Sequence, residues 1–453
     1  GSGTITLNGG TVTSVQVSGG TLNVQNEDAK ITSGIQLDKG AKDVNITAGT
    51  IGGDITVAPE VTPDKITISG GTIEDGDAVK DYLEEGKSLD ENGNVVESTV
   101  AKIGEVKYTF LQEALDAAVA GKGNVTVTIL ENVDLTNVTW KPVTVSAPHY
   151  PVVTVEGNNK TITGLTDMLF AGTWAGGSGL IIKDLTIENS TIVNDKDDAE
   201  GTVGVGAFIG YPQASATITL ENCHLKNSSV EGGHWTGGLI GMAGGYNGTD
   251  GPVFMNLTIK GCSVTGSTIT GKGSVGGVIG HGSCAAWTSV VIEETTVSGN
   301  KITSTGSSNV KAGAVMGTIG AAGQSTTVNG TTKTGGATVS ATVADNTVKS
   351  NNAEITTIYG RQGTATGMLY LAGGSYDNNP IEENVTYAAP VEGYEIVSNT
   401  DGTYGIQEIK IAQIGETSYK TLEAAFNAAK NDDEVEILKA GTYALSTSGK
   451  NIT

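Results

Sequence analysis

An 18-residue pattern occurs twice in this 453-residue chain, with 311 residues between equivalent positions. The first copy spans 101–118 and the second spans 412–429. In each copy, apolar residues recur at i, i+4 and i+7, which is typical of an amphipathic helix. These residues are Leu111, Leu115 and Ala118 in the first copy, and Leu422, Phe426 and Ala429 in the second. An internal repeat of this length predicts a tandem array of large modules, with helices near 109–119 and 420–430.

A second, shorter repeat lies between the two copies. Four 13-residue segments align without gaps, at 180–192, 218–230, 257–269 and 290–302, and a looser fifth copy is expected at 341–353. Apolar residues occupy positions 1, 3, 8 and 13 of the four close copies, and Asn or Gly interrupts the alternation, as in short strands joined by tight corners. Stacked coils would bring equivalent residues within about 4.8 Å of each other. The alignment therefore predicts one buried ladder at position 3 and another at position 6. The first contains Ile182, Leu220, Ile259 and Ile292, and the second contains Leu185, Cys223, Cys262, Thr295 and Asn346.

A third element, an apolar strand bracketed by glycines, recurs in phase with the second between about residues 200 and 320. Its four copies span 206–210, 237–241, 276–280 and 313–317. Glycine at both ends suits a sharp, close-packed corner where a Cβ atom would clash. We therefore expect structural roles for the closing glycines, Gly210, Gly241, Gly280 and Gly317.

The order of helix, turn and strand in the 18-residue pattern resembles the N-terminal cap of pectin-lyase-like right-handed β-helices. The glycine-bracketed element resembles the GLUG motif of bacterial surface proteins, including the immunoglobulin A-cleaving zinc peptidases of Gram-positive cocci. Together these resemblances imply an all-β chain of right-handed parallel β-helix (solenoid) modules in tandem, each with a short N-terminal α-helical cap. They also imply a non-catalytic, adhesin-like repeat protein, secreted by or anchored to the wall of a Gram-positive gut bacterium.

The repeats predict three parts. Residues 1–98 are expected to hold the C-terminal coils of a preceding module and a linker, and residues 99–406 one complete module. Residues 407–453 are expected to hold the cap helix and first coil of a following module.

The amino-acid composition limits the classes of partner that this chain can bind. The formal net charge is −23, and Arg361 is the only arginine. Nucleic acid is therefore excluded as a partner, because phosphate binding needs clustered Lys and Arg. Polyanionic substrates are disfavoured for the same reason. No segment reaches the roughly 18 uninterrupted apolar residues of a membrane span. Neutral glycans, host surface proteins and further modules of the same chain remain as partners, and no cofactor is implied.

Catalytic motifs are sparse. No histidine belongs to an H-E-x-x-H zinc motif, so the peptidase activity of GLUG-bearing proteins does not carry over. Gly280-His281-Gly282 resembles one element of the polygalacturonases, but the other elements of that family are out of order or missing. A carbohydrate-active enzyme, either a polysaccharide lyase or a glycoside hydrolase working in the β-helix groove, is the alternative function. The acidic residues Asp195, Asp197, Asp198 and Glu200 form a weak Ca²⁺ candidate, for which a solvated loop is the simpler interpretation.

Aromatic residues give a better candidate site. Rings in glycine-rich loops at one phase of a solenoid would project from one side, where they would line a shared groove and stack on neutral sugars. The alternative is that each ring covers its own loop. The candidate ligand-binding residues are Trp174, His234, Trp235, Tyr246, His281 and Trp287.

The three cysteines give no disulfide scaffold. Cys223 and Cys262 are expected to point into the core as small apolar residues. A disulfide between them stays open, because adjacent coils bring Cα atoms within bridging range. Cys284 is left over in a loop.

Overall fold

The chain is all-β and its main sheets are parallel, as the repeats predict. The computed structural model describes residues 3–62, 65–74, 79, 82–84, 86–90, 92–121, 123–145, 152–173, 178–194, 204–212, 217–244, 246–248, 251–283, 288–306, 311–319, 325–328, 331–334, 336–350, 353–355, 369–381, 388–430 and 432–443. They form two compact units, Gly1–Ala114 and Leu115–Thr453. No helix in the described parts of the chain is long and apolar enough to cross a membrane.

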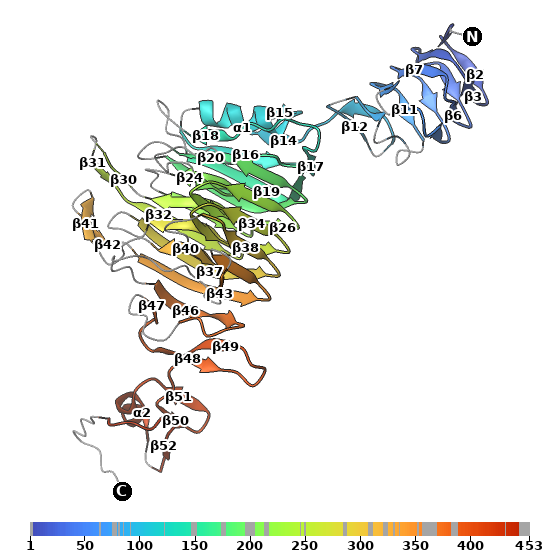
Figure 1. The fold of residues 1–453 in the computed structure, drawn as a ribbon. Coiled ribbons are helices and arrows are strands. Elements are labelled where there is room, and N and C mark those ends of the chain that lie inside the picture. The colour runs from blue at the N-terminus through green and yellow to red at the C-terminus, as the bar shows by residue number, and fades with distance from the viewer. Residues whose placement is uncertain are drawn as a thin grey trace. The chain divides into compact units, whose positions relative to one another are not determined.

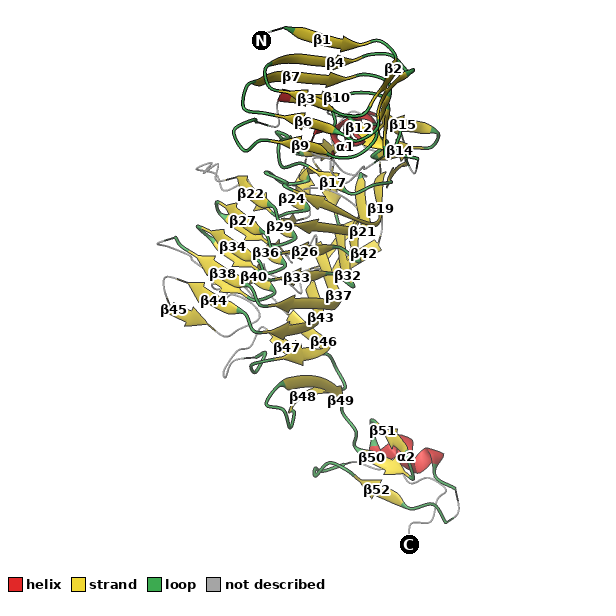
Figure 2. Ribbon diagram, turned by 90° about the vertical axis from the view of Figure 1, so that its right-hand side faces the viewer, coloured by secondary structure: helices red, strands yellow, loops and turns green. Residues whose placement is uncertain are grey.

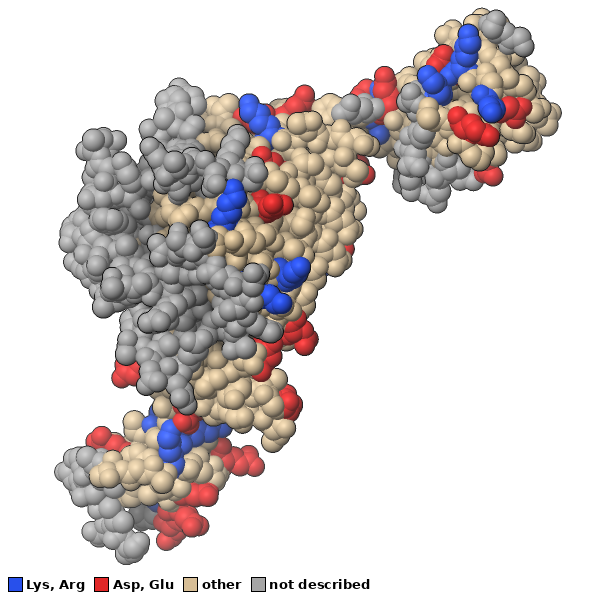
Figure 3. Space-filling model, in the orientation of Figure 1, with Lys and Arg blue, Asp and Glu red and all other residues tan. Residues whose placement is uncertain are grey.

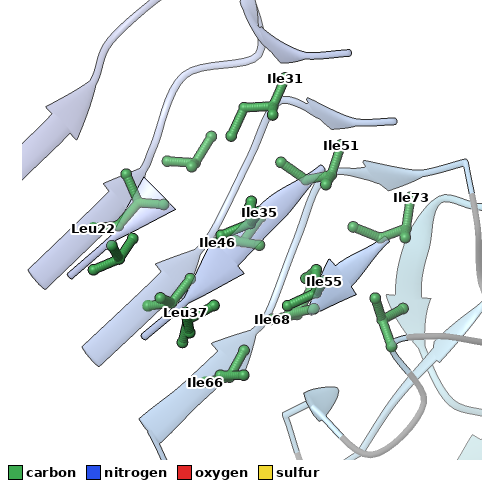
Figure 4. Packing of buried hydrophobic residues seen from close by; sticks show 14 of the residues in the cluster. Leu22, Ile31, Ile35, Leu37, Ile46, Ile51, Ile55, Ile66, Ile68 and Ile73 are labelled. Atoms are coloured by element: carbon green, nitrogen blue, oxygen red, sulfur yellow. The ribbon is translucent and has the colours of Figure 1, made fainter. Parts of the chain in front are cut away.

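The first unit is built from three parallel sheets that the chain visits in turn. We call one pass of the chain through such a set of sheets a rung. The first sheet contains β1 (Thr4–Leu7), β4 (Gly20–Val24), β7 (Ala41–Ile46) and β10 (Ile66–Ile68); the second contains β2 (Gly10–Val12), β5 (Ala29–Ile31), β8 (Thr50–Ile51) and β11 (Thr72–Ile73); the third contains β3 (Val15–Val17), β6 (Ile35–Leu37) and β9 (Ile55–Val57). Their alternate residues meet in one apolar core, in which Leu22, Ile46 and Ile68 come from successive rungs (Figure 4). This alternation of buried and exposed positions is what the apolar-polar pattern of short strands produces.

The second unit repeats this plan on a larger scale, with strands stacked in the order of the chain (Figure 1). Its main sheet contains β16 (Val125–Ile129), β19 (Val152–Thr163), β21 (Gly179–Glu188), β25 (Thr217–Glu221), β32 (Met255–Lys260), β37 (Thr288–Ser298), β43 (Gly336–Ala344) and β46 (Leu369–Tyr376), with β26 (His224–Lys226) and β33 (Ser263–Thr265) alongside. A second sheet, seen as one row in Figure 2, contains β22 (Thr191–Asn194), β27 (Ser229–Gly232), β34 (Thr268–Gly271), β38 (Lys301–Ser304), β44 (Thr347–Ser350) and the antiparallel β45 (Ala353–Ile355).

Two further sheets complete each rung. One contains β23 (Gly204–Val205), β28 (Trp235–Gly237), β35 (Ser274–Gly276) and β39 (Lys311–Gly313). The other contains β18 (Val143–Val145), β20 (Phe170–Thr173), β24 (Ile209–Pro212), β29 (Ile240–Gly244), β36 (Ile279–Ser283) and β40 (Met316–Ile319). The glycine-bracketed elements join these two sheets, so that each rung turns sharply from one to the other.

The predicted apolar ladder is present. Ile182 lies opposite Leu220, Leu220 opposite Ile259, and Ile259 opposite Ile292. All four side chains are fully buried. The 13-residue alignment therefore found the register of the main sheet.

The Asn and Gly residues that interrupt the apolar alternation lie at corners whose backbone adopts the left-handed conformation. Asp184 and Asn222, at position 5 of their repeats, have φ of 49° and 51°. Asn189 and Asn227, at position 10, have φ of 49° and 46°. Gly261 occupies the first of these corners in the next repeat, with φ of 64°. Asn, Asp and Gly tolerate this conformation best, so the interruptions of the apolar alternation mark two turns per rung.

The predicted place of Asn346 at position 6 is wrong. The main sheet brings Ala337, not Ala341, opposite Val290, and an irregularity in the register after Ile292 places Ala341 opposite Thr295. The fifth repeat therefore starts earlier than the sequence pattern suggested, and its first corner is shorter.

Asn346 belongs instead to a buried polar ladder at the second corner. The backbone N–H groups of Ser190, Ser228, Ser267 and Asn300 donate in turn to the side-chain oxygens of Ser228, Ser267, Asn300 and Asn346. Buried N–H groups are costly to leave unpaired. This ladder pairs the N–H groups at the corners, which have no partner within the sheets.

Both predicted helices are present, as α1 (Leu111–Ala120) and α2 (Leu422–Ala428). In α1 the buried residues are Leu111, Ala114, Leu115 and Ala118, which form one stripe. Helix α2 begins after the N-cap Thr421, whose hydroxyl accepts a hydrogen bond from the Ala424 N–H. It packs with β50 (Ala412–Ile414), β51 (Thr417–Tyr419) and β52 (Val435–Ile437) around a small core of its own. The three-part division of the chain stays a prediction.

Candidate functional site

The glycine-bracketed corners bring two sheets of the second unit into backbone contact. A Cβ atom added at Gly241 would lie 2.1 Å from the backbone nitrogen of Val205, and one at Gly280 would lie 2.5 Å from that of Thr236. Gly317 stands in the same relation to Val275, at 2.5 Å. These distances leave no room for a side chain, because the strand after each corner lies directly against a strand of the preceding rung. Trp235, next to Thr236, and His281, next to Gly280, are thereby brought close together.

Four aromatic side chains meet beside these corners, and we call them the aromatic cluster: Tyr211, His234, Trp235 and His281. The ring centroid of Trp235 lies 5.5 Å from that of His281, in a stacked arrangement with an interplanar angle of 26°. Tyr211 and His234 approach the Trp235 ring edge-on, with centroids 5.9 and 5.2 Å away. Such offset and edge-to-face contacts each add about 0.5–1.5 kcal/mol beyond the burial of area. The cluster is therefore a packed unit with Trp235 at its centre.

The cluster spans three rungs. Tyr211 lies on β24, Trp235 on β28 of the next rung, and His281 on β36 of the rung after that. Trp235 is held in register between Gly204 and Ser274, and His281 between Met242 and Thr318. Trp235 is half-buried, and His234 is exposed. The backbone of Trp235 is paired on both sides, and part of its ring is exposed to solvent. This arrangement suits contact with a partner.

The sequence placed these residues in loops, and that expectation is wrong for Trp235 and His281. Both lie on strands, because the parallel ladder continues through them on either side. The prediction that Trp235, His234 and His281 lie in one site agrees with their ring contacts. It missed Tyr211, although the signal was present: Tyr211 follows Gly210 as His281 follows Gly280.

The other candidates cannot be placed in the cluster. Tyr246 begins β30 (Tyr246–Gly248), and its side chain lies outside the described part of the chain. Trp174, Trp287 and Cys284 also lie outside the described residues, as does the acidic segment with Asp195, Asp197, Asp198 and Glu200. In the described residues, no group of three or more His, Cys, Asp and Glu side chains could hold a metal ion.

Two hydroxyl groups and a phenol lie at or beside the cluster. Burial raises the pKa of the Tyr211 phenol, so it stays protonated at neutral pH. The hydroxyls of Ser274 and Thr318, the ladder neighbours of Trp235 and His281, are hydrogen-bonded to each other. Both hydroxyls are buried, so a ligand would be held by stacking on the exposed part of the cluster, at Trp235 and His234.

Several charged side chains in the described part of the second unit pair with opposite charges. On the outward face of the main sheet, Glu156, Lys183 and Glu221 are ladder neighbours, and Lys183 lies 3.8 and 3.9 Å from the two carboxylates. Figure 3 shows lysines and acidic side chains interspersed among the described residues. Among the residues that the structure describes, this pattern offers polyanions no concentrated positive field.

Cys223 and Cys262 are buried, and both thiols are free. The backbone N–H of Cys223 donates to the sulfur of Cys262 at 3.4 Å, which places the two residues on adjacent rungs. Burial raises the pKa of the Cys223 thiol well above its ordinary value. The hydrogen bond with Cys223 lowers the pKa of the Cys262 thiol, so the proton of the pair stays on Cys223. Both residues are buried and act as small core groups.

His224 and Ser263 form a separate polar contact, 2.9 Å long, between β26 and β33. Burial, and to a lesser degree the charge of Lys226, lowers the pKa of His224. His224 is therefore neutral at neutral pH. The contact follows the ladder between the two strands.

Comparison with known proteins adds little to what the geometry of the site indicates about function. No family model matches the sequence, and no curated protein matches it. A matching solved structure is described as a "putative immunoglobulin A1 protease" from Bacteroides ovatus. It is 13% identical, the match covers 62% of this chain and 85% of that one, and the TM-score is 0.32. A likeness of this size carries no conclusion about the fold or the activity of the present chain.

Proposed function

We propose that this chain is a non-catalytic repeat protein of a bacterial cell surface, secreted or wall-anchored, that serves as a stalk or adhesin. Its sheets are proposed to form right-handed parallel β-helix modules in tandem, with α1 and α2 as caps of successive modules. The aromatic cluster around Trp235 is proposed as its contact site for neutral glycans.

The observation that carries the proposal is the aromatic cluster held across three rungs. Hydrogen-bonded ladders fix Trp235 and His281 on both sides, so little ordering is needed when a partner binds. A half-buried ring fixed in this way offers stacking area at low entropic cost. The net charge of −23 disfavours an anionic partner and leaves a neutral one.

Replacing Trp235 with alanine tests this function. The wild-type chain should bind neutral glycans on an array, and Trp235→Ala should bind them at least about tenfold more weakly. The expected size follows from the loss of about 2 kcal/mol or more when a central aromatic contact is truncated.

Tyr370→Ala is the matched control, because Tyr370 is an aromatic residue of the same unit that is 40% exposed on the main sheet. It should bind as the wild type does. Equal losses in the two variants, or unchanged binding by Trp235→Ala, would remove the aromatic cluster from the proposed function.

A further inference from the structure

Two of the three cysteines lie side by side in the interior of the second unit. Cys223 directly precedes β26 and Cys262 directly precedes β33, and these two strands are parallel neighbours. The backbone N–H of Ser263, which follows Cys262, donates to the carbonyl oxygen of Cys223 at 3.0 Å. The two cysteines are therefore neighbours in one ladder, on rungs that stand about 4.8 Å apart.

The sulfur of Cys262 points towards the rung of Cys223. It accepts a hydrogen bond from the backbone N–H of Cys223 at 3.4 Å, and its S–H donates to the carbonyl oxygen of Leu220 on that rung at 3.5 Å. The two thiols are also hydrogen-bonded to each other. Disulfides join cysteines whose Cα atoms lie about 4.4–6.8 Å apart, a range that includes the spacing between rungs. The backbone thus already holds the two residues at the separation that a disulfide needs.

One contact has to be given up when the two sulfurs join. The sulfur of Cys223 lies 3.3 Å from the carbonyl oxygen of Ile182 on the preceding rung. A turn of this side chain about its Cα–Cβ bond would bring the sulfur towards Cys262, with the backbone left in place. Because S–H is a weak donor, the lost contact with Ile182 costs little.

The rest of the ladder offers neither sulfur another partner. Its next members are Leu185 on one side and Thr295 on the other, and both are fully buried, as the cysteines are. The remaining cysteine, Cys284, lies outside the described residues. A disulfide between Cys223 and Cys262 would be enclosed by the core, where reducing agents do not reach it.

We propose that Cys223 and Cys262 are an oxidation site, at which a disulfide joins two adjacent rungs when the chain folds in an oxidising environment. The oxidant is another disulfide, carried by a small molecule or by a disulfide oxidoreductase. Because the folded core encloses both thiols, the exchange takes place before the rungs close. This site is independent of the aromatic cluster and of the proposed glycan binding.

The reaction is an ordinary thiol–disulfide exchange in two steps. The hydrogen bond with Cys223 lowers the pKa of the Cys262 thiol, so Cys262 is the first to act as a thiolate. It attacks one sulfur of the oxidant, which forms a mixed disulfide and releases one thiolate. Cys223 then loses its proton to water, and its sulfur displaces the second thiolate. The two cysteines are oxidised to one disulfide, and the oxidant is reduced to two thiols.

The Cys284→Ser chain, which keeps only this pair of thiols, tests the proposal. After export to an oxidising bacterial periplasm it should contain no thiol that an alkylating reagent modifies. It should also be about 2 Da lighter than the same chain made in a reducing cytoplasm, because two hydrogen atoms are lost. The two residues are 39 positions apart, so the disulfide closes a long loop in the unfolded chain. The midpoint of thermal unfolding should therefore rise by about 5 °C or more.

Cys223→Ala, made in the Cys284→Ser chain, is the matched control. Its single thiol, Cys262, should be alkylated in protein from either compartment, and the two preparations should unfold at the same temperature. Circular dichroism should show the same fold in every preparation. A Cys284→Ser chain that folds in the periplasm and keeps both thiols free would overturn the proposal. So would a disulfide that joins two chains to each other instead of two rungs of one chain.

Discussion

Leu220→Asp should unfold the central rungs of the second unit, with a far larger loss of stability than any surface change. Leu220 is fully buried between Ile182 and Ile259 in the apolar ladder. Truncation of such a residue to alanine already costs about 2–5 kcal/mol. An unpaired carboxylate there costs more, because nothing in the apolar ladder can pair with its charge. Thermal unfolding followed by circular dichroism should show a lost or strongly lowered transition.

Thr219→Asp, on the outward face of the same strand, is the matched control. Thr219 pairs with Ile181 and Thr258 at positions that solvent reaches. Its substitution should change the midpoint little, since surface changes usually stay within about 0.5 kcal/mol. If both aspartates had the same effect, the ladder would not be the core of the unit.

Gly280→Ala should also be strongly damaging, despite adding only one methyl group. The new Cβ atom would meet the backbone nitrogen of Thr236 at 2.5 Å and the carbonyl oxygen of Gly241 at 2.6 Å. Neither atom belongs to a flexible side chain, so the two sheets would have to separate. We expect a loss of about 1–3 kcal/mol or more, the usual cost of overpacking. Because Trp235 and His281 flank this corner, glycan binding should fall as well.

Gly405→Ala separates this effect from the ordinary loss of a glycine. At Gly405 the nearest atoms to an added Cβ would be side-chain atoms of Asn399 and Gln407, at 3.5 and 3.6 Å. This variant should unfold and bind as the wild type does. A Gly280→Ala protein as stable as Gly405→Ala would show that the corner tolerates a side chain.

The repeats in the sequence were enough to predict the main sheet, because one constraint acts on every rung. Ile182, Leu220, Ile259 and Ile292 each face the same interior, so the same apolar position recurs and marks the register. The left-handed corners left a similar mark at Asn189 and Asn227, since few residues accept that backbone conformation.

The sequence pattern predicted the wrong register where a rung is shorter than the others. The last repeat is shorter at its first corner, so a comparison of sequences shifted Asn346 into the wrong ladder. The extension of strands through Trp235 and His281 was missed for a different reason. This extension depends on backbone pairing with neighbouring rungs, such as the pairing of Trp235 with Gly204 and Ser274. Local residue preferences do not predict such pairing.

Three of the four residues of the aromatic cluster could be predicted from the sequence. Trp235 and His281 stood out because tryptophan and histidine are rare in this chain, which has four of each. Tyr211 did not stand out among 13 tyrosines. Its contact with Trp235 depends on how far apart successive rungs stand at the corner, and the glycines set that distance.

The mass of a glycan after contact with the chain tests the central claim most directly, that the protein binds sugars without altering them. Neutral glycans retained by the wild type, together with polygalacturonate in the presence and absence of Ca²⁺, should be recovered after long incubation and weighed by mass spectrometry. We expect every glycan at its starting mass, with retention of the neutral ones dependent on Trp235. Shortened or unsaturated products that the wild type forms and that Arg361→Ala or Trp235→Ala does not form would contradict this account and identify an enzyme.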